Sequence, residues 1–171
     1  RRRINVPLLN TIAGGHGFLM DNYRRYSHFI VRSVDHIFKT FLGDATIEEV
    51  FDTQSSKKDP WVVIEIEGTI SGELVINLPH KTLDRITRRM LPEIHGRSLK
   101  KYRDEVAGEL ANMITGTFVN QLQFLKHNVR LSPPEFNEDP ITLKTFYENI
   151  NLSFRSCFGG FDVDLYYRDN R

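Results

Sequence analysis

Two alternating segments near the end of the chain, joined by a tight turn, restrict the possible fold most strongly. Apolar residues occupy every second position of ENINLSFRS (residues 148–156) and of FDVDLYYR (residues 161–168). The intervening CFGG suits a hairpin turn. The pattern therefore predicts two adjacent antiparallel strands, each with one buried face.

The rest of the chain adds further strand patterns and three helical ones. WVVIEIEG (61–68) alternates, and ELVINLP (73–79) follows it after a glycine turn, so we expect both to form an antiparallel meander with residues 47–53. Helical periodicity covers residues 22–42, 80–91 and 98–127. Gly43 is placed to end the first of these helices, and Pro92 closes the second. SPPEF and a polar loop precede the last hairpin. This order predicts an α+β fold: a mainly antiparallel sheet of about six strands with long helices packed on one face.

The length and composition indicate one domain preceded by an arm. A chain of 171 residues with 40% hydrophobic content can bury one sizeable core, which we place in residues 22–171. Residues 1–21 are expected to be an N-terminal extension, with a flexible joint at Gly14, Gly15 and Gly17. The chain begins with arginine, so we expect a trimmed product or a piece of a longer protein.

Charge and apolar runs exclude several classes of function. The formal net charge is +1 and both signs are interspersed, which argues against nucleic acid as the partner. No apolar run reaches the roughly 18 residues of a membrane span, so we expect no membrane partner.

Cysteine and histidine usage suggests neither a metal site nor thiol chemistry. The single cysteine, Cys157, excludes an intrachain disulfide and fits a reducing, cytoplasmic setting, and its place at a strand end favours a buried thiol over a nucleophile. The histidines lack metal-ligand spacing and are expected on helix surfaces and in loops; they are residues 16, 28, 36, 80, 95 and 127.

The segment GELANMITG (108–116) places two glycines inside the longest helical pattern, each costing about 1 kcal/mol relative to alanine. At 100° per residue, the sector predicted to face the core holds Val106, Leu110, Met113 and Thr117, with Ile114 and Gln121 at its margin. A second stripe, about 60° wide and roughly 100° away, holds Glu105, Glu109, Asn112 and Gly116. Without a β-carbon, Gly116 would let another backbone approach Asn112. On geometry alone, an ordinary solvated helix surface is the commoner explanation of this stripe.

The segments SGELVINLP (71–79), DEVAGELANMITG (104–116) and LSPPEF (131–136) resemble the CheX branch of the CheC-like chemotaxis phosphatases. The family pattern is Asp or Ser, three residues, Glu, two residues, Asn, about twenty-two residues, and Pro. Glu105, Glu109, Asn112 and Pro134 stand at these four positions. Two departures are the longer Glu105 at the first position and a proline spacing that is one residue short.

The resemblance implies a CheC-like fold and a hydrolase, a protein phosphatase that removes the phosphoryl group from the aspartate of a CheY-type response regulator. Asn112 would orient the attacking water, and Glu109 would pair with a lysine of the regulator. Glu105, Gly108, Gly116 and Pro134 are then candidate partner-binding positions. The resemblance also implies that no metal or other cofactor is held by this chain, that Mg²⁺ is held by the partner's carboxylates, and that the protein forms a homodimer through sheet edges, with 148–156 or 161–168 as candidate edge strands.

A second function remains open, in which the chain is a non-catalytic module that binds a receiver domain or a flagellar-switch component. Members of the wider superfamily include flagellar-switch proteins, so the fold alone does not separate the two functions. The basic run RSLKKYR (97–103) is expected to be a solvated helix start, with the alternative that it steers an acidic regulator toward the site.

Overall fold

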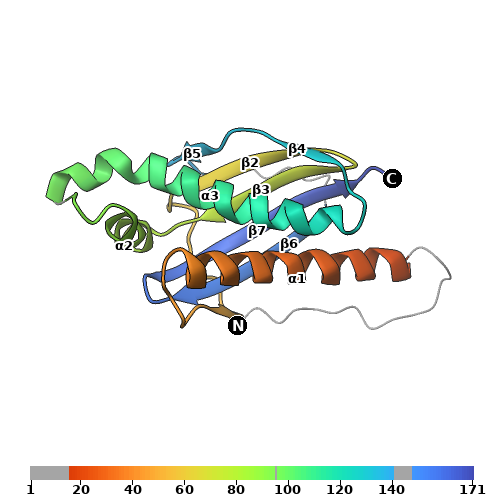
Figure 1. Cartoon of the computed structure of the whole chain (residues 1–171), viewed down its shortest axis with the longest axis horizontal. Coiled ribbons are helices and arrows are strands. Elements are labelled where there is room, and N and C mark those ends of the chain that lie inside the picture. Colours follow the sequence, from red (N-terminus) through yellow and green to blue (C-terminus); the bar gives the residue numbers. More distant parts are fainter. Residues whose placement is uncertain (1–15, 95, 141–147) are drawn as a thin grey trace.

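The computed structural model describes residues 16–94, 96–140 and 148–171. The helices are α1 (His16–Thr40), α2 (His80–Met90) and α3 (Leu99–Gln123), with a 3-10 turn (Gly96–Ser98) before α3. The strands are β1 (Glu48–Val50), β2 (Trp61–Gly68), β3 (Ile70–Asn77), β4 (Val129–Leu131), β5 (Glu135–Asn137), β6 (Glu148–Ser156) and β7 (Gly159–Asp169). The described strands form one seven-stranded sheet in which every pairing is antiparallel, and the helices lie together on one of its faces (Figure 1). The predicted α+β architecture is confirmed.

The strand order is β1-β6-β7-β3-β2-β4, with β5 also paired to β2. The hairpins β2–β3 and β6–β7 have the predicted partners. The first strand departs from the predicted meander because β1 pairs with β6 and not with β2. β7 lies inside the sheet between β6 and β3, so the prediction that it could be an edge strand is wrong. β6 is covered by β1 only opposite residues 153–155.

The strands β4 and β5 follow the outer edge of β2, where the sequence predicted only a loop. β4 pairs with residues 66–68 of β2 and β5 with residues 61–63. Between them, the backbone N–H of Ser132 donates to the carbonyl of Glu65 at 3.0 Å, so the edge is nearly continuous. Pro133 and Pro134 have no N–H to donate, which interrupts the ladder at an edge, where prolines are tolerated.

The helix α1 begins six residues before the predicted start, at His16, and Gly17 lies within it, so the proposed joint does not extend to Gly17. Its packing against α3 outweighs the helix cost of a single glycine, about 1 kcal/mol. Gly43 follows the helix with φ of +69°, the left-handed conformation that ends helices. The rest of the predicted extension, residues 1–15 with Gly14 and Gly15, lies outside the described residues.

The buried face of α3 is wider than the sequence indicated. Ile114 and Phe118 are fully buried at its centre, while Met113 and Thr117, predicted to face the core, are only half-buried. The reason is that α3 packs against α1, α2 and the sheet together. The centre of this wide face therefore lies about 160° from the stripe that contains Glu109 and Asn112, rather than roughly 100°. None of the helices in the described segments is both long and apolar enough to cross a membrane.

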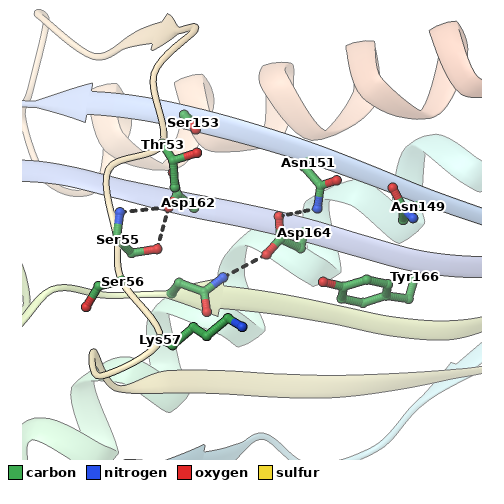
Figure 2. Close-up of a pocket in the computed structure, with 11 residues that line it drawn as sticks. Thr53, Ser55, Ser56, Lys57, Asn149, Asn151, Ser153, Asp162, Asp164 and Tyr166 are labelled. Carbon is green, nitrogen blue, oxygen red and sulfur yellow. Dashed lines mark hydrogen bonds between the residues drawn. The ribbon is translucent and has the colours of Figure 1, made fainter. Parts of the chain in front are cut away.

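On the sheet face opposite the helices, the chain after β1 crosses over the strands as a strap, residues 53–57 (Figure 2). The carboxylate of Asp162 accepts hydrogen bonds from the backbone N–H groups of Gln54 (3.0 Å) and Ser55 (2.8 Å). Asp164 accepts from the side-chain amides of Asn77 and Asn151, both at 2.8 Å. A polar pocket of about 320 Å³ lies there. The Asp162 contacts hold the strap against the sheet, whereas the Asp164 contacts join β7 to β3 and β6.

Candidate functional site

A groove of about 470 Å³ runs along the exposed side of α3, where the β4–β5 edge approaches the helix. It is lined by Asp104, Glu105, Gly108, Glu109, Asn112, Pro134 and Phe136. The sequence-predicted site residues therefore share one concave surface, with the exception of Gly116, which lies one turn beyond Asn112.

The side chains of Glu109 and Asn112 leave α3 on the same side because three residues separate them on a helix. Both are exposed. No residue in the described ranges forms a hydrogen bond or an ion pair with either side chain. A carboxylate and an amide on a rigid element, unused by the fold, are therefore available to an external ligand.

The two walls of the groove touch at Gly108 and Pro134. A β-carbon placed on Gly108 would lie 3.2 Å from Cγ and 3.7 Å from Cβ of Pro134, so the proline ring already occupies the space next to this buried glycine. The first helical glycine thus has a role inside the fold, since it lets the edge segment pack closely against α3.

Gly116 differs from Gly108, because a β-carbon added there meets no atom of the described residues within 4 Å. Its helix cost of about 1 kcal/mol is therefore not explained by packing among them. The glycine leaves α3 smooth beside Asn112, as a closely approaching partner would require.

The electrostatic character of the groove is acidic. Asp104, Glu105 and Glu109 contribute carboxylates, and no Lys, Arg or His of the described chain is among the lining residues. Arg103, one residue before Asp104, is turned toward α2, where its Nε and Nη2 atoms lie 2.6 and 2.9 Å from the two carboxylate oxygens of Asp84. The groove therefore fits a cationic group better than a bare anion.

Two lining residues were not predicted, Asp104 and Phe136. Phe136 lies two positions after Pro134, and side chains two apart on an extended strand point to the same side. The spacing in PPEF could have indicated this residue, but three-residue strands give too weak a pattern for β5 to be recognised.

Other candidates from the sequence lie elsewhere. Cys157 is exposed in the β6–β7 turn and not buried as expected, and the pKa of its thiol is raised by partial burial and by the nearby Asp44 carboxylate, which argues against a thiolate nucleophile. Within the ranges that the structure describes, no group of three or more His, Cys, Asp and Glu residues could hold a metal ion.

His127 is buried, contrary to the expectation of a surface or loop histidine, with 4% of its surface exposed. Its Nε2 lies 2.8 Å from the Tyr26 hydroxyl and its Nδ1 lies 3.0 Å from that of Thr69. Burial and the charge of Arg171 lower its pKa, so the ring is neutral in the folded protein at pH 7. His127 therefore supports the fold beyond the end of α3.

Comparisons with known proteins give a family match for the part of the chain that contains this site. Residues 61–143 match the family model for the chemotaxis phosphatase CheX, and this range contains every residue that lines the groove. No curated protein sequence matches the chain significantly.

Solved structures share the fold. The chain is similar to CheX in a CheX–CheY–BeF3–Mg²⁺ complex from Borrelia burgdorferi, with a TM-score of 0.70, 19% identity, and 84% of this chain and 97% of that one covered. A CheC-like superfamily protein from Shewanella sp. PV-4 (TM-score 0.68, 19% identity, 84% and 97% covered) and the chemotaxis protein CheX from Vibrio vulnificus (0.68, 18%, 84% and 96%) are also similar. The family model matches residues 61–143, just under half of the chain, and the solved structures share the fold, so these findings together support a CheX-type protein of the CheC-like superfamily.

Proposed function

We propose that this protein dephosphorylates the aspartyl phosphate of a CheY-type response regulator at the α3 groove. The observation that carries the proposal is the pair Glu109 and Asn112, exposed one helical turn apart and free of partners among the described residues. The family whose model matches is one of chemotaxis phosphatases, and the Borrelia burgdorferi CheX is found in a complex with CheY.

In the proposed reaction, water attacks phosphorus in line with the aspartyl oxygen. The bond between phosphorus and that oxygen breaks, a bond to the water oxygen forms, and the products are a carboxylate and inorganic phosphate carrying the protons of water. A carboxylate with an ordinary pKa of about 4 is a good leaving group and needs no general acid. The demand on this chain is therefore positioning rather than acid-base chemistry.

The Asn112 side chain meets that demand because an amide offers both a donor and an acceptor. It can hold one water in a fixed orientation without removing its proton. Asn112 is set on the rigid α3, whose opposite face is buried, so the amide can enter a partner's site with little loss of conformational freedom in its backbone.

We assign to Glu109 an ion pair with a lysine of the regulator. The acidic lining formed with Asp104 and Glu105 favours a cation in this position. The same lining would repel a free phosphoryl group, so the acyl phosphate must arrive already neutralised. We therefore place Mg²⁺ on the regulator, held by the regulator's own carboxylates.

The test is the decay of acyl phosphate on purified CheY-type regulators with wild type, Asn112→Ala and Asn120→Ala. Asn120 is another exposed amide on α3, two turns beyond Asn112, and serves as the matched control. We expect wild type and Asn120→Ala to accelerate the decay equally, and Asn112→Ala to lose about 10²- to 10³-fold, the usual effect of removing one transition-state contact.

Binding to a BeF3-activated regulator must survive in Asn112→Ala for this loss to report on water positioning. Wild-type rates in Asn112→Ala would refute the assignment. A wild-type protein that binds regulators without accelerating phosphate loss would establish instead the non-catalytic binding module.

We further propose a cytoplasmic homodimer that pairs through residues 148–152 of β6. These residues pair with β7 on one side, and none of the described residues pairs with their other side. An exposed strand edge is a template for pairing with a second copy. Light scattering on the purified protein, with Asn151→Pro to block pairing, tests the proposal, and a monomeric wild type contradicts it.

A further inference from the structure

A basic surface lies beside the acidic groove, on α2 and the first turn of α3. Although the whole chain has a formal net charge of only +1, residues 80–103 contain eight Lys or Arg and two acidic residues. The exposed cations whose side chains the structure describes are Lys81, Arg85, Arg88, Arg89, Lys100 and Lys101. Charge is therefore segregated in this protein, and a total near zero conceals a strongly positive region.

The centre of this basic surface is a second groove, of about 560 Å³, between α2 and α3. Its charged lining residues are Asp84, Arg88, Lys100 and Arg103. The bidentate contact with Arg103 neutralises the Asp84 carboxylate. Arg88 and Lys100 have no ion-pair partner among the residues that the structure describes, so their charges remain available to an external anion.

The two grooves are neighbours along α3, because Arg103 lines the basic one and the next residue, Asp104, lines the acidic one. Twelve residues separate Lys100 from Asn112, about 18 Å along the helix axis. A small domain is about 30 Å across, so one partner seated on Asn112 can cover both grooves.

We propose that the basic surface around Arg88 and Lys100 is a second docking site for the same response regulator and binds an acidic face of that protein. The inference rests on the proposed function. Because the two adjacent grooves carry opposite charges, they determine the orientation in which the regulator binds. Its lysine meets Glu109, and its carboxylates meet Arg88 and Lys100. The pair of contacts steers the two proteins into this alignment as they associate.

The charge distribution favours a protein with localised carboxylates over a nucleic acid. A polyanion lying along α3 would leave the basic surface and meet Asp104, Glu105 and Glu109 within a few helical turns. Outside residues 80–103 acidic residues exceed basic ones, so the surroundings repel an extended polyanion.

The test compares two charge-reversal variants of equal size. Arg88→Glu combined with Lys100→Glu alters the basic surface. Lys58→Glu combined with Arg168→Glu changes the net charge equally and is the control: Arg168 lies on the sheet face opposite the helices and Lys58 follows the strap, and both are exposed. Circular dichroism checks that both variants are folded.

The measurement is the association rate with a BeF3-activated regulator at low and physiological salt, followed by single-turnover dephosphorylation at saturating protein. We expect reversal of the basic surface to slow association about tenfold or more at low salt and to flatten its salt dependence, as loss of electrostatic steering does. The saturating rate and the control should stay within about twofold of wild type, since rim charges act mainly on association.

Equal association rates for the two variants overturn the proposal, as does failure of the wild type to bind any regulator. Binding of duplex DNA at physiological salt that is lost on reversal of the basic surface also overturns it, in favour of nucleic acid. A wild type whose association needs Arg88 and Lys100 but which releases no phosphate supports the docking site and refutes the catalytic function instead.

Discussion

The two glycines of α3 give a paired prediction, because the structure assigns them different neighbours. In Gly116→Ala the new methyl group meets no described atom within 4 Å, so the substitution introduces no clash. Alanine is about 1 kcal/mol more favourable than glycine within a helix. We therefore expect the free energy of unfolding to rise by about 1 kcal/mol and the melting temperature by about 2–4 °C.

Gly108→Ala should not show this gain. Its methyl group would lie 3.2 Å from Cγ of Pro134, so the edge segment must shift by a few tenths of an ångström. The cost of that shift offsets the gain in helix propensity, and we expect a stability equal to or below that of wild type. Urea denaturation of both variants measures the difference directly.

The same pair distinguishes stability from function. If a regulator's backbone packs beside Gly116, the added methyl group overpacks that contact by about 1–3 kcal/mol, and kcat/KM for dephosphorylation falls about tenfold or more. A Gly116→Ala protein that is more stable and fully active would refute a partner contact at this position. A destabilised Gly116→Ala would refute the structural reasoning itself.

Three further predictions concern the fold. The free energy of unfolding should fall as the pH drops below about 6.5, because burial lowers the pKa of His127 and the unfolded chain then binds more protons than the folded one. His127→Gln should flatten the dependence of the urea midpoint on pH. An unchanged pH profile in this variant would contradict the prediction. Phe118→Ala, at a fully buried position, should cost about 3–5 kcal/mol in chemical denaturation, and a loss below about 1 kcal/mol would mean that α3 is not packed as described. Asp162→Asn should cost about 1–3 kcal/mol and speed amide exchange at Gln54 and Ser55, whose N–H groups bond to the carboxylate; unchanged exchange would count against the strap.

Periodicity in the sequence was sufficient to predict the helices and strands that bury one face against a single layer. The hairpin β6–β7, the hairpin β2–β3 and the helix α2 were predicted from local patterns and are present with nearly the predicted bounds. Such segments can be recognised from the local sequence, because every second residue of a strand, or every third to fourth residue of a helix, is apolar and buried.

Structural features that depend on tertiary contacts were not predicted correctly. β4 and β5 are three residues long and exist because β2 offers them an edge, which no local pattern records. The buried face of α3 was placed off-centre, since only its simultaneous packing against α1, α2 and the sheet buries Ile114 and Phe118. His127 was assigned to the surface because its hydrogen bonds with Tyr26 and Thr69, which are distant in sequence, hold it in the interior and leave no local pattern.

For the candidate site, spacing predicted that Glu109 and Asn112 share a face, and the structure places both in one groove with Pro134. The contact between Pro134 and Gly108 could not be foreseen, because it joins a helix to an edge segment. The basic surface was recognised only in part, since α2 and the start of α3 come together through the Asp84–Arg103 pair. The roles of the site residues stay predictions until the kinetic tests are made.

Because Pro134 contacts Gly108, the groove exists only while the edge segment stays packed against α3. One wall belongs to a long helix in the core, and the other to short strands attached to the outside of β2. Short edge elements generally open at a lower free energy than the core, so we expect residues 129–137 to open before the rest of the molecule does. Each such opening removes Pro134 and Phe136 from the groove but leaves Glu109 and Asn112 in place on α3, so local opening of the edge can disable the site long before the protein unfolds.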